Sequence, residues 1–210
     1  MSSRLIYVMD PMCSWCWGFA PVVQALTEQA QARGATADLV VGGLRQERIA
    51  MDQAARERTV SYWHAVHEAS GQPFDLASGL PEGLIYDTEP ACRALVAARS
   101  FEADAVWRLA PIIQRAFYVE GRDVTLPPVL VELAEEAGIP AGDFSELFDS
   151  QGVRDTTAAD FDWARNLGIA GFPTLLAEHD GQLVLLTNGF QPLEALAPLL
   201  TRWLDHNLSA

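Results

Sequence analysis

The order of apolar and polar positions near the N-terminus predicts a strand, a helix and a second strand. Residues 5–9 form an uninterrupted apolar run that ends at Asp10, which is typical of a short buried strand. From 17 to 33, apolar residues recur near helical spacing, and Gly34 ends the pattern. A second short buried strand is predicted for 38–42. Together these elements form a β-α-β unit.

The middle of the chain, from about residue 45 to 149, shows helical periodicity throughout. Five stretches carry apolar residues at helical spacing: 48–69, 89–99, 102–117, 127–137 and 144–149. Glycine and proline separate these stretches, and none of them alternates as a strand would. We therefore predict an all-helical insertion of roughly 100 residues, a size typical of a subdomain.

Mixed structure returns in the last part of the chain. A helix is predicted for 157–167, and an amphipathic helix over 192–206 closes the sequence. Between them lie two predicted strands, 174–177 and 183–187, joined by a hairpin turn at Asp180-Gly181.

The order of these elements defines the fold class. A β-α-β unit, a helical block and an α-β-β-α unit predict an α/β thioredoxin fold with a large all-helical insertion. The thioredoxin-like domain would comprise residues 1–44 and 150–210, and the inserted helical domain residues 45–149.

Composition and charge narrow the classes of partner. Half of the 210 residues are hydrophobic and 20% are charged, which is ordinary for a globular protein. The formal net charge of −14 disfavours nucleic acid and anionic membranes, since binding phosphate requires clustered Lys and Arg. The apolar run 5–9 is too short for a secretory signal, and no uncharged apolar run approaches a membrane span. We expect a cytoplasmic protein that binds neither nucleic acid nor membrane.

Two of the three cysteines stand at CxxC spacing in Cys13-Ser14-Trp15-Cys16. Cys13 follows the first predicted strand, so it should lie at the N-terminal end of the helix, where unpaired N–H groups favour an anion. The thiolate is the nucleophile in disulfide chemistry, and Cys16 lies close enough to attack a mixed disulfide formed on Cys13. The spacing predicts a redox-active dithiol.

Zinc binding and a structural disulfide are both less compatible with these cysteines. A structural zinc site normally has four ligands, and neither Cys92 nor the four scattered histidines supply the spacing. A structural disulfide is disfavoured in a reducing compartment. Cys92 is expected to be a small buried residue. We therefore predict no metal.

A second motif, Gly171-Phe172-Pro173-Thr174, stands directly before a predicted strand. A cis bond before Pro173 would expose the backbone of Phe172 beside the thiols and leave it free to pair with a substrate chain. A trans proline in a tight turn is the alternative. Beside the cysteines, Met12, Ser14 and Trp15 are candidates for an apolar substrate surface, whereas Trp17 is expected to pack into the core.

These motifs resemble the DsbA-like thioredoxin family. The resemblance rests on residues 10–19 and 171–174 and extends over the helical insertion, where 89–94 and 120–124 are similar to cytoplasmic, FrnE-like members described as predicted protein-disulfide isomerases. It implies that Cys13 is an exposed nucleophile, Cys16 the resolving thiol and Pro173 a cis proline. The periplasmic oxidases of the family carry histidine between the cysteines. Ser14-Trp15 lacks that positive charge, which implies a less oxidising dithiol.

The predicted function is that of a thiol–disulfide oxidoreductase of the reductase or isomerase type, acting on protein or small-molecule thiols and disulfides through a mixed disulfide on Cys13. No cofactor is expected, and glutathione remains open as a co-substrate. The family also resembles kappa-class glutathione transferases and hydroxychromene-carboxylate isomerases, which have serine in place of the first cysteine. A glutathione-dependent transferase or isomerase is thus one alternative. A non-catalytic chaperone or metal-stress binding protein is the second.

Overall fold

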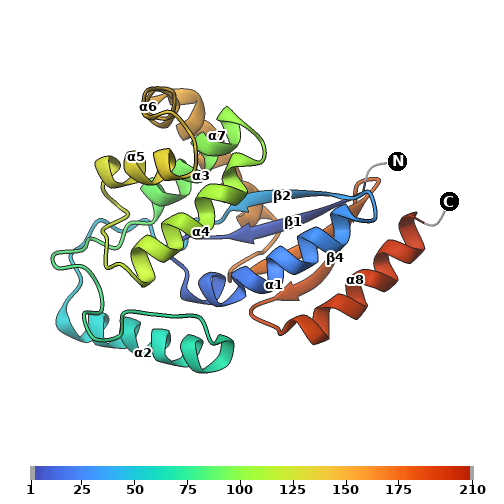
Figure 1. The fold of residues 1–210 in the computed structure, drawn as a ribbon, viewed down its shortest axis with the longest axis horizontal. Coiled ribbons are helices and arrows are strands. Elements are labelled where there is room, and N and C mark those ends of the chain that lie inside the picture. The colour runs from blue at the N-terminus through green and yellow to red at the C-terminus, as the bar shows by residue number, and fades with distance from the viewer. Residues whose placement is uncertain (1–2, 209–210) are drawn as a thin grey trace.

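A four-stranded mixed sheet forms the centre of the computed structural model, which describes residues 3–208 (Figure 1). The strand order is β2-β1-β3-β4. β1 is parallel to β2 and antiparallel to β3, and β3 is antiparallel to β4. The strands are β1 (Ser3–Met9), β2 (Thr36–Val41), β3 (Thr174–His179) and β4 (Gln182–Asn188). The uninterrupted apolar run of the sequence is therefore a central strand that is buried on both faces, as such runs are.

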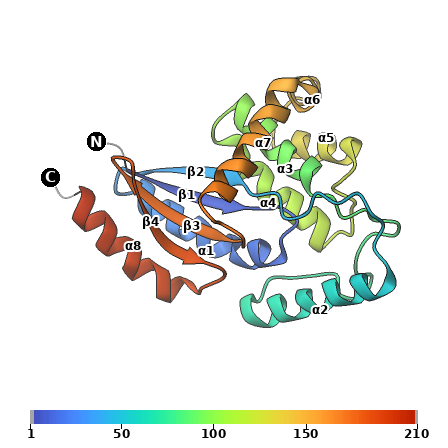
Figure 2. The same ribbon diagram turned by 180° about the vertical axis from the view of Figure 1, so that it is seen from behind.

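Helices cover both faces of this sheet. Leu5, Tyr7 and Met9 of β1 share a hydrophobic core with α1 (Ser14–Gln31) and α8 (Leu193–Leu208). The alternate residues of β1, Ile6 and Val8, point the other way and pack with Ala164 of α7 (Gln151–Asn166). Figures 1 and 2 show α1 and α7 on opposite sides of β1.

The insertion between β2 and α7 is helical, as predicted. Its helices are α2 (Gln53–Ser70), α3 (Glu89–Phe101), α4 (Ala105–Tyr118), α5 (Pro127–Glu136) and α6 (Ala141–Asp149). Their buried side chains belong to the same continuous core as the α1 face of the sheet. The division at 44/45 and 149/150 stays a prediction, and its outer ends, residues 1–2 and 209–210, lie outside the described residues. No helix within residues 3–208 is long and apolar enough to cross a membrane.

Three helices begin earlier than the sequence pattern predicts; one of them, α6, begins at Ala141 rather than at residue 144. α1 begins at Ser14 rather than at residue 17, since the carbonyl of Cys13 already accepts the N–H of Cys16. α7 begins at Gln151 rather than at residue 157, since the hydroxyl of Ser150 accepts the N–H of Val153. The first turn of α7 is polar and carries no apolar periodicity.

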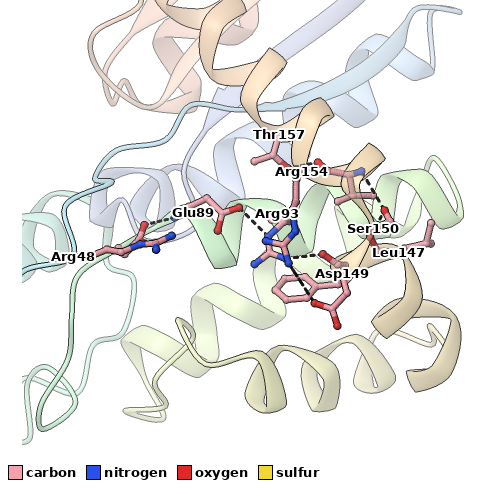
Figure 3. Close-up of polar contacts among 11 residues, drawn as sticks. Arg48, Glu89, Arg93, Leu147, Asp149, Ser150, Arg154 and Thr157 are labelled. Atoms are coloured by element: carbon pink, nitrogen blue, oxygen red, sulfur yellow. Dashed lines mark hydrogen bonds and ion pairs between the residues drawn. The ribbon is translucent and has the colours of Figure 1, made fainter.

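A buried arginine joins two helices of the insertion, α3 and α6 (Figure 3). The Arg93 guanidinium of α3 pairs with Glu89 at 2.8 Å and donates to the carbonyl of Phe148 in α6 at 2.7 Å. It also lies 3.9 Å above the Phe148 ring centroid, a cation–π contact. Beside it, Ser150 donates to Leu147 and caps α7. This network fixes α7, and hence the face of the sheet that α7 covers.

Candidate active site

Cys13 is the N-cap residue of α1. Its backbone is extended, with φ −88° and ψ 115°, and its carbonyl accepts the N–H groups of Cys16 at 3.0 Å and Trp17 at 3.2 Å. Its own N–H donates to the carbonyl of Asp10 at 3.0 Å, which closes the turn between β1 and α1. The Cys13 side chain therefore lies at the positive end of the helix dipole, where the sequence predicts it.

The two thiols of the CxxC motif are neighbours, and both are free. Burial raises the pKa of the Cys16 thiol well above its usual value, and the hydrogen bond and charge of Cys13 raise it further. Cys16 is 0% exposed. Cys13 retains 6% of its surface, so the expectation of an exposed nucleophile is wrong: the chain around it covers most of the residue.

The loop that precedes β3 reaches the Cys13 thiol. The Sγ of Cys13 donates to the carbonyl oxygen of Phe172 at 3.5 Å, and the peptide bond between Phe172 and Pro173 is cis. The carbonyl of Pro173 accepts the N–H of Gly189 at 2.7 Å, which ties the loop to the end of β4. The structure thus brings together four of the sequence-predicted site residues: Cys13, Cys16, Phe172 and Pro173.

Gly42 makes the position of the Phe172 ring possible. A Cβ on Gly42 would lie 2.0 Å from Cζ of Phe172, far inside van der Waals contact. The backbone of Gly42 continues from β2, and its N–H donates to the carbonyl of Met9 at 2.8 Å. The end of β2 therefore supports the loop that meets the thiol, and sequence reasoning misses this residue because nothing local marks the need for space.

Met12 does not line the substrate surface, contrary to the sequence prediction. Its side chain is completely buried. The reason lies in the turn: the Met12 N–H donates to the Asp10 carboxylate at 2.8 Å, and its carbonyl accepts the hydroxyl of Tyr86 at 2.6 Å. Because Asp10 binds the N–H and Tyr86 binds the carbonyl of Met12, the residue is fixed in the core rather than at the surface.

The remaining candidates lie nearer the surface. Ser14 and Trp15 are half-buried, and the Trp15 ring packs on Phe190 with 5.7 Å between centroids. Trp17 packs in the core, as predicted, and its indole N–H donates to the carbonyl of Pro73 at 2.9 Å. Ser14 and Trp15 therefore adjoin the thiol from α1, on a segment whose next aromatic residue faces inward.

A fully buried carboxylate under the turn has no counterpart in the sequence predictions. Oδ2 of Asp10 accepts the N–H of Leu44 at 2.7 Å, the hydroxyl of Thr88 at 2.6 Å and the thiol of Cys92 at 3.3 Å. Burial raises the pKa of Asp10, and these hydrogen bonds oppose that rise. Cys92 is buried, as expected, and burial raises the pKa of its thiol as well. The only feature of the sequence that points to this buried carboxylate is that an acidic residue directly follows a buried strand.

Comparison with known proteins identifies the class. The DSBA-like thioredoxin domain family matches residues 4–201, so the chain belongs to this family of thiol–disulfide oxidoreductases. A solved structure from Nitrosomonas europaea, titled a "putative protein disulfide isomerase", is 40% identical with a TM-score of 0.92, covering 98% of this chain and 99% of that one.

Two further relatives are informative. The cytosolic disulfide reductase DsbM from Pseudomonas aeruginosa is 32% identical with a TM-score of 0.79, covering 95% of this chain and 98% of that one, and is also solved with GSH. The curated ClpXP adapter protein SpxH from Halalkalibacterium halodurans is 22% identical over 176 residues, which are 82% of this chain. The chain spans only 57% of the length of that relative.

Proposed function

We propose that this protein is a cytoplasmic disulfide reductase or isomerase that works through the Cys13–Cys16 dithiol. One observation carries the proposal: the Cys13 thiol at the start of α1 lies 3.5 Å from the Phe172 carbonyl and beside a second, fully buried thiol. This arrangement supplies a nucleophile, a resolving group and a backbone site for substrate. The relationship to a reductase described as cytosolic supports both the direction of the reaction and the compartment.

The reaction begins on Cys13. Its thiolate attacks one sulfur of a substrate disulfide, the substrate S–S bond breaks, and the departing sulfur leaves as a thiolate that takes up a proton. The product is a mixed disulfide between Cys13 and the substrate. The carbonyl of Phe172, released from the Cys13 thiol, accepts a backbone N–H of the substrate chain. Ser14 and Trp15 form the surrounding surface, whereas Pro173, which the sequence predicts at that surface, is buried behind the Phe172 carbonyl.

Cys16 completes the exchange. It loses its proton and attacks Sγ of Cys13, the mixed disulfide breaks, and the substrate leaves with two electrons as a dithiol. The high pKa of Cys16 keeps it protonated while Cys13 attacks, which separates the two roles. Two molecules of a small thiol then reduce the Cys13–Cys16 disulfide and leave as their own disulfide. Glutathione is the thiol we propose, on the strength of the GSH-bound relative.

Residues around the dithiol favour reduction over oxidation. No histidine stands between the cysteines, and the buried Asp10 charge adds to the pKa of Cys16. Neighbours that destabilise a thiolate destabilise the reduced dithiol at neutral pH, so the disulfide form is favoured and the dithiol is a better electron donor. We propose a reduction potential nearer to that of thioredoxin than to that of the periplasmic oxidases.

The test compares three serine variants in insulin reduction and in a glutathione-coupled assay with a small disulfide. Cys13→Ser should abolish turnover. Cys16→Ser should lose insulin reduction and accumulate a mixed disulfide that mass spectrometry places on Cys13. Cys92→Ser, which removes a buried thiol outside the site, is the matched control and should keep activity. Turnover in Cys16→Ser equal to that of the unaltered protein would contradict the resolving role.

A further inference from the structure

A cavity of about 650 Å³ lies between α1 and α4, above the face of β1. Most of its walls come from three elements: Tyr7 of β1, Trp17 and Thr27 of α1, and Trp107 and Gln114 of α4; Leu39 of β2 and Gln72 after α2 complete the lining. Neither cysteine of the dithiol lines it, and the loop before β3 does not reach it. Figure 1 shows α1 and α4 crossing the same side of the sheet, α1 toward α8 and α4 toward α3.

Three buried polar groups in its wall have no well-oriented partner. The Thr27 hydroxyl and the Gln114 side-chain amide nitrogen make no hydrogen bond within residues 3–208, and the Tyr7 hydroxyl has no well-oriented partner there, although the Cys16 thiol lies within reach of it. Their residues are 3%, 9% and 2% exposed. Native proteins pair nearly all buried polar groups, and five side-chain atoms in the described part of this chain depart from that rule. Three of those five line this one cavity, from three different elements.

All three groups can donate a hydrogen bond: a phenol, an alcohol and a carboxamide. A molecule that satisfies them carries acceptors, such as carbonyl or ring oxygens. Burial is the main cause that raises the pKa of Tyr7 well above its usual value, and the nearby Cys16 raises it further. The Tyr7 hydroxyl therefore stays protonated and acts as a donor.

The remaining wall combines the rings of Trp17 and Trp107 with aliphatic residues and glutamines, and it carries no positive charge free to bind an anion. The rings of Tyr7 and Trp107 stack with 6.3 Å between centroids. Glu28 and Asp104 lie in the lining, whereas Arg108 is already hydrogen-bonded to Glu102 and to the carbonyl of Ala137. With a net charge of −14 on the whole chain, the electrostatic environment disfavours an anionic ligand.

We propose that this cavity is a binding site for a small, uncharged, flat molecule with an apolar body and at least one carbonyl-type acceptor. Its volume falls in the range of about 300–1,000 Å³ typical of small-molecule sites, and an apolar lining with a few convergent polar groups is the usual composition of such sites. Tyr7 and Thr27 are separate donors along the wall, because Tyr7 lies near Cys16 whereas Thr27 lies about three turns further along α1. The acceptor meets the Tyr7 hydroxyl, and the flat body lies against Trp107. Binding here does not require the dithiol chemistry.

The test uses three probes of one shape: 2-acetylnaphthalene, 2-ethylnaphthalene and 2-naphthoate. Titration calorimetry and quenching of tryptophan fluorescence measure binding to the full-length protein. We expect the ketone to bind at least tenfold more tightly than the hydrocarbon and than the carboxylate. Equal affinity of ketone and hydrocarbon, tighter binding of the carboxylate, or no binding up to the solubility limit would each overturn the proposal, the last leaving a cavity that holds water only.

Substitutions locate the contact. Tyr7→Phe removes the hydroxyl of a residue that lines the cavity. It should weaken the affinity for the ketone at least fivefold and leave the affinity for the hydrocarbon unchanged. Tyr118→Phe is the matched control, since Tyr118 is also a fully buried tyrosine but does not line the cavity. The affinity of Tyr118→Phe for the ketone should equal that of the unaltered protein. Thr27→Val supplies a second test if Tyr7→Phe folds poorly, and Cys13→Ser should bind as the unaltered protein does. Equal effects of Tyr7→Phe and Tyr118→Phe would refute the assignment.

Discussion

Replacing Gly42 with alanine should damage the site without touching either thiol. Gly42 has no positive φ, so the effect is one of space alone. The added Cβ would lie 2.0 Å from Cζ and 2.1 Å from Cε1 of the Phe172 ring. An ordinary contact begins near 3.4 Å, so the half-buried ring must retreat by about 1.4 Å from where it packs against the Ile6–Val8–Leu176 cluster.

We expect the displaced ring to move the Phe172 backbone, because the ring is held on its other side by the cluster of Ile6, Val8 and Leu176. The Phe172 carbonyl lies 3.5 Å from the Cys13 thiol, at the limit of a hydrogen bond to sulfur, so a shift of this size breaks the contact. Overpacking of this kind costs about 1–3 kcal/mol of unfolding free energy. We expect that loss in urea denaturation, together with at least tenfold slower insulin reduction, measured on protein that is folded by circular dichroism.

Gly152→Ala is the matched control. Gly152 lies within α7, where an added Cβ meets nothing within 4 Å. This variant should be neutral or more stable by up to about 1 kcal/mol, because alanine is the better helix former. Gly42→Ala would refute the steric reasoning if its unfolding free energy stayed within about 0.5 kcal/mol of the unaltered protein and its turnover did not change.

Three single contacts give further predictions. Asp10→Asn should lower the unfolding free energy by about 1–3 kcal/mol, because the amide leaves at least one buried donor unpaired. Burial raises the pKa of Asp10 above 3.8, so the unaltered protein loses stability as pH rises from 3.8 through that raised pKa, whereas the Asn variant does not. The difference in unfolding free energy between the two should therefore shrink over that range, which urea denaturation at several pH values would measure. Ser150→Ala should cost about 1 kcal/mol in thermal unfolding through loss of the α7 cap, with Thr156→Ala, an exposed site on the same helix, as the neutral comparison. In stopped-flow experiments, the release of glutathione from a Cys13 mixed disulfide should accelerate about tenfold per pH unit between about pH 7 and 9. The reason is that the pKa of Cys16 is raised, and below that pKa the fraction of Cys16 thiolate rises about tenfold per pH unit. A release rate independent of pH would exclude Cys16 as the attacking group.

The elements of the fold can be predicted because their signals are local. The apolar run of β1, the helical periodicity of the insertion and the Asp180-Gly181 turn each lie within a few neighbouring residues, and the fold class is confirmed. Apolar spacing misplaces the starts of α1 and α7, because the first backbone hydrogen bonds of α1 reach back to Cys13 and the Ser150 side chain caps α7.

The supports of the site depend on long-range contacts that no local pattern encodes. Tyr86 holds the carbonyl of Met12 from 74 positions away, and Thr88 reaches Asp10 across 78. This is why the sequence predicts Met12 at the surface whereas the structure places it in the core. The need for glycine at position 42 arises from a ring 130 residues later, since Phe172 fills the space where a side chain would stand.

The contact between Cys13 and Phe172 also has a consequence for the order in which the protein is made. The two residues are separated by 159 positions, and the whole helical insertion lies between them. At a synthesis rate of about 5–20 residues per second, the thiol leaves the ribosome roughly 8–30 s before the loop that covers it. During that interval the nascent chain carries a cysteine without its partner carbonyl or the ring that rests on Gly42. The site is therefore complete only after β3 and β4 have been synthesised, 159 or more residues after the thiol that they approach.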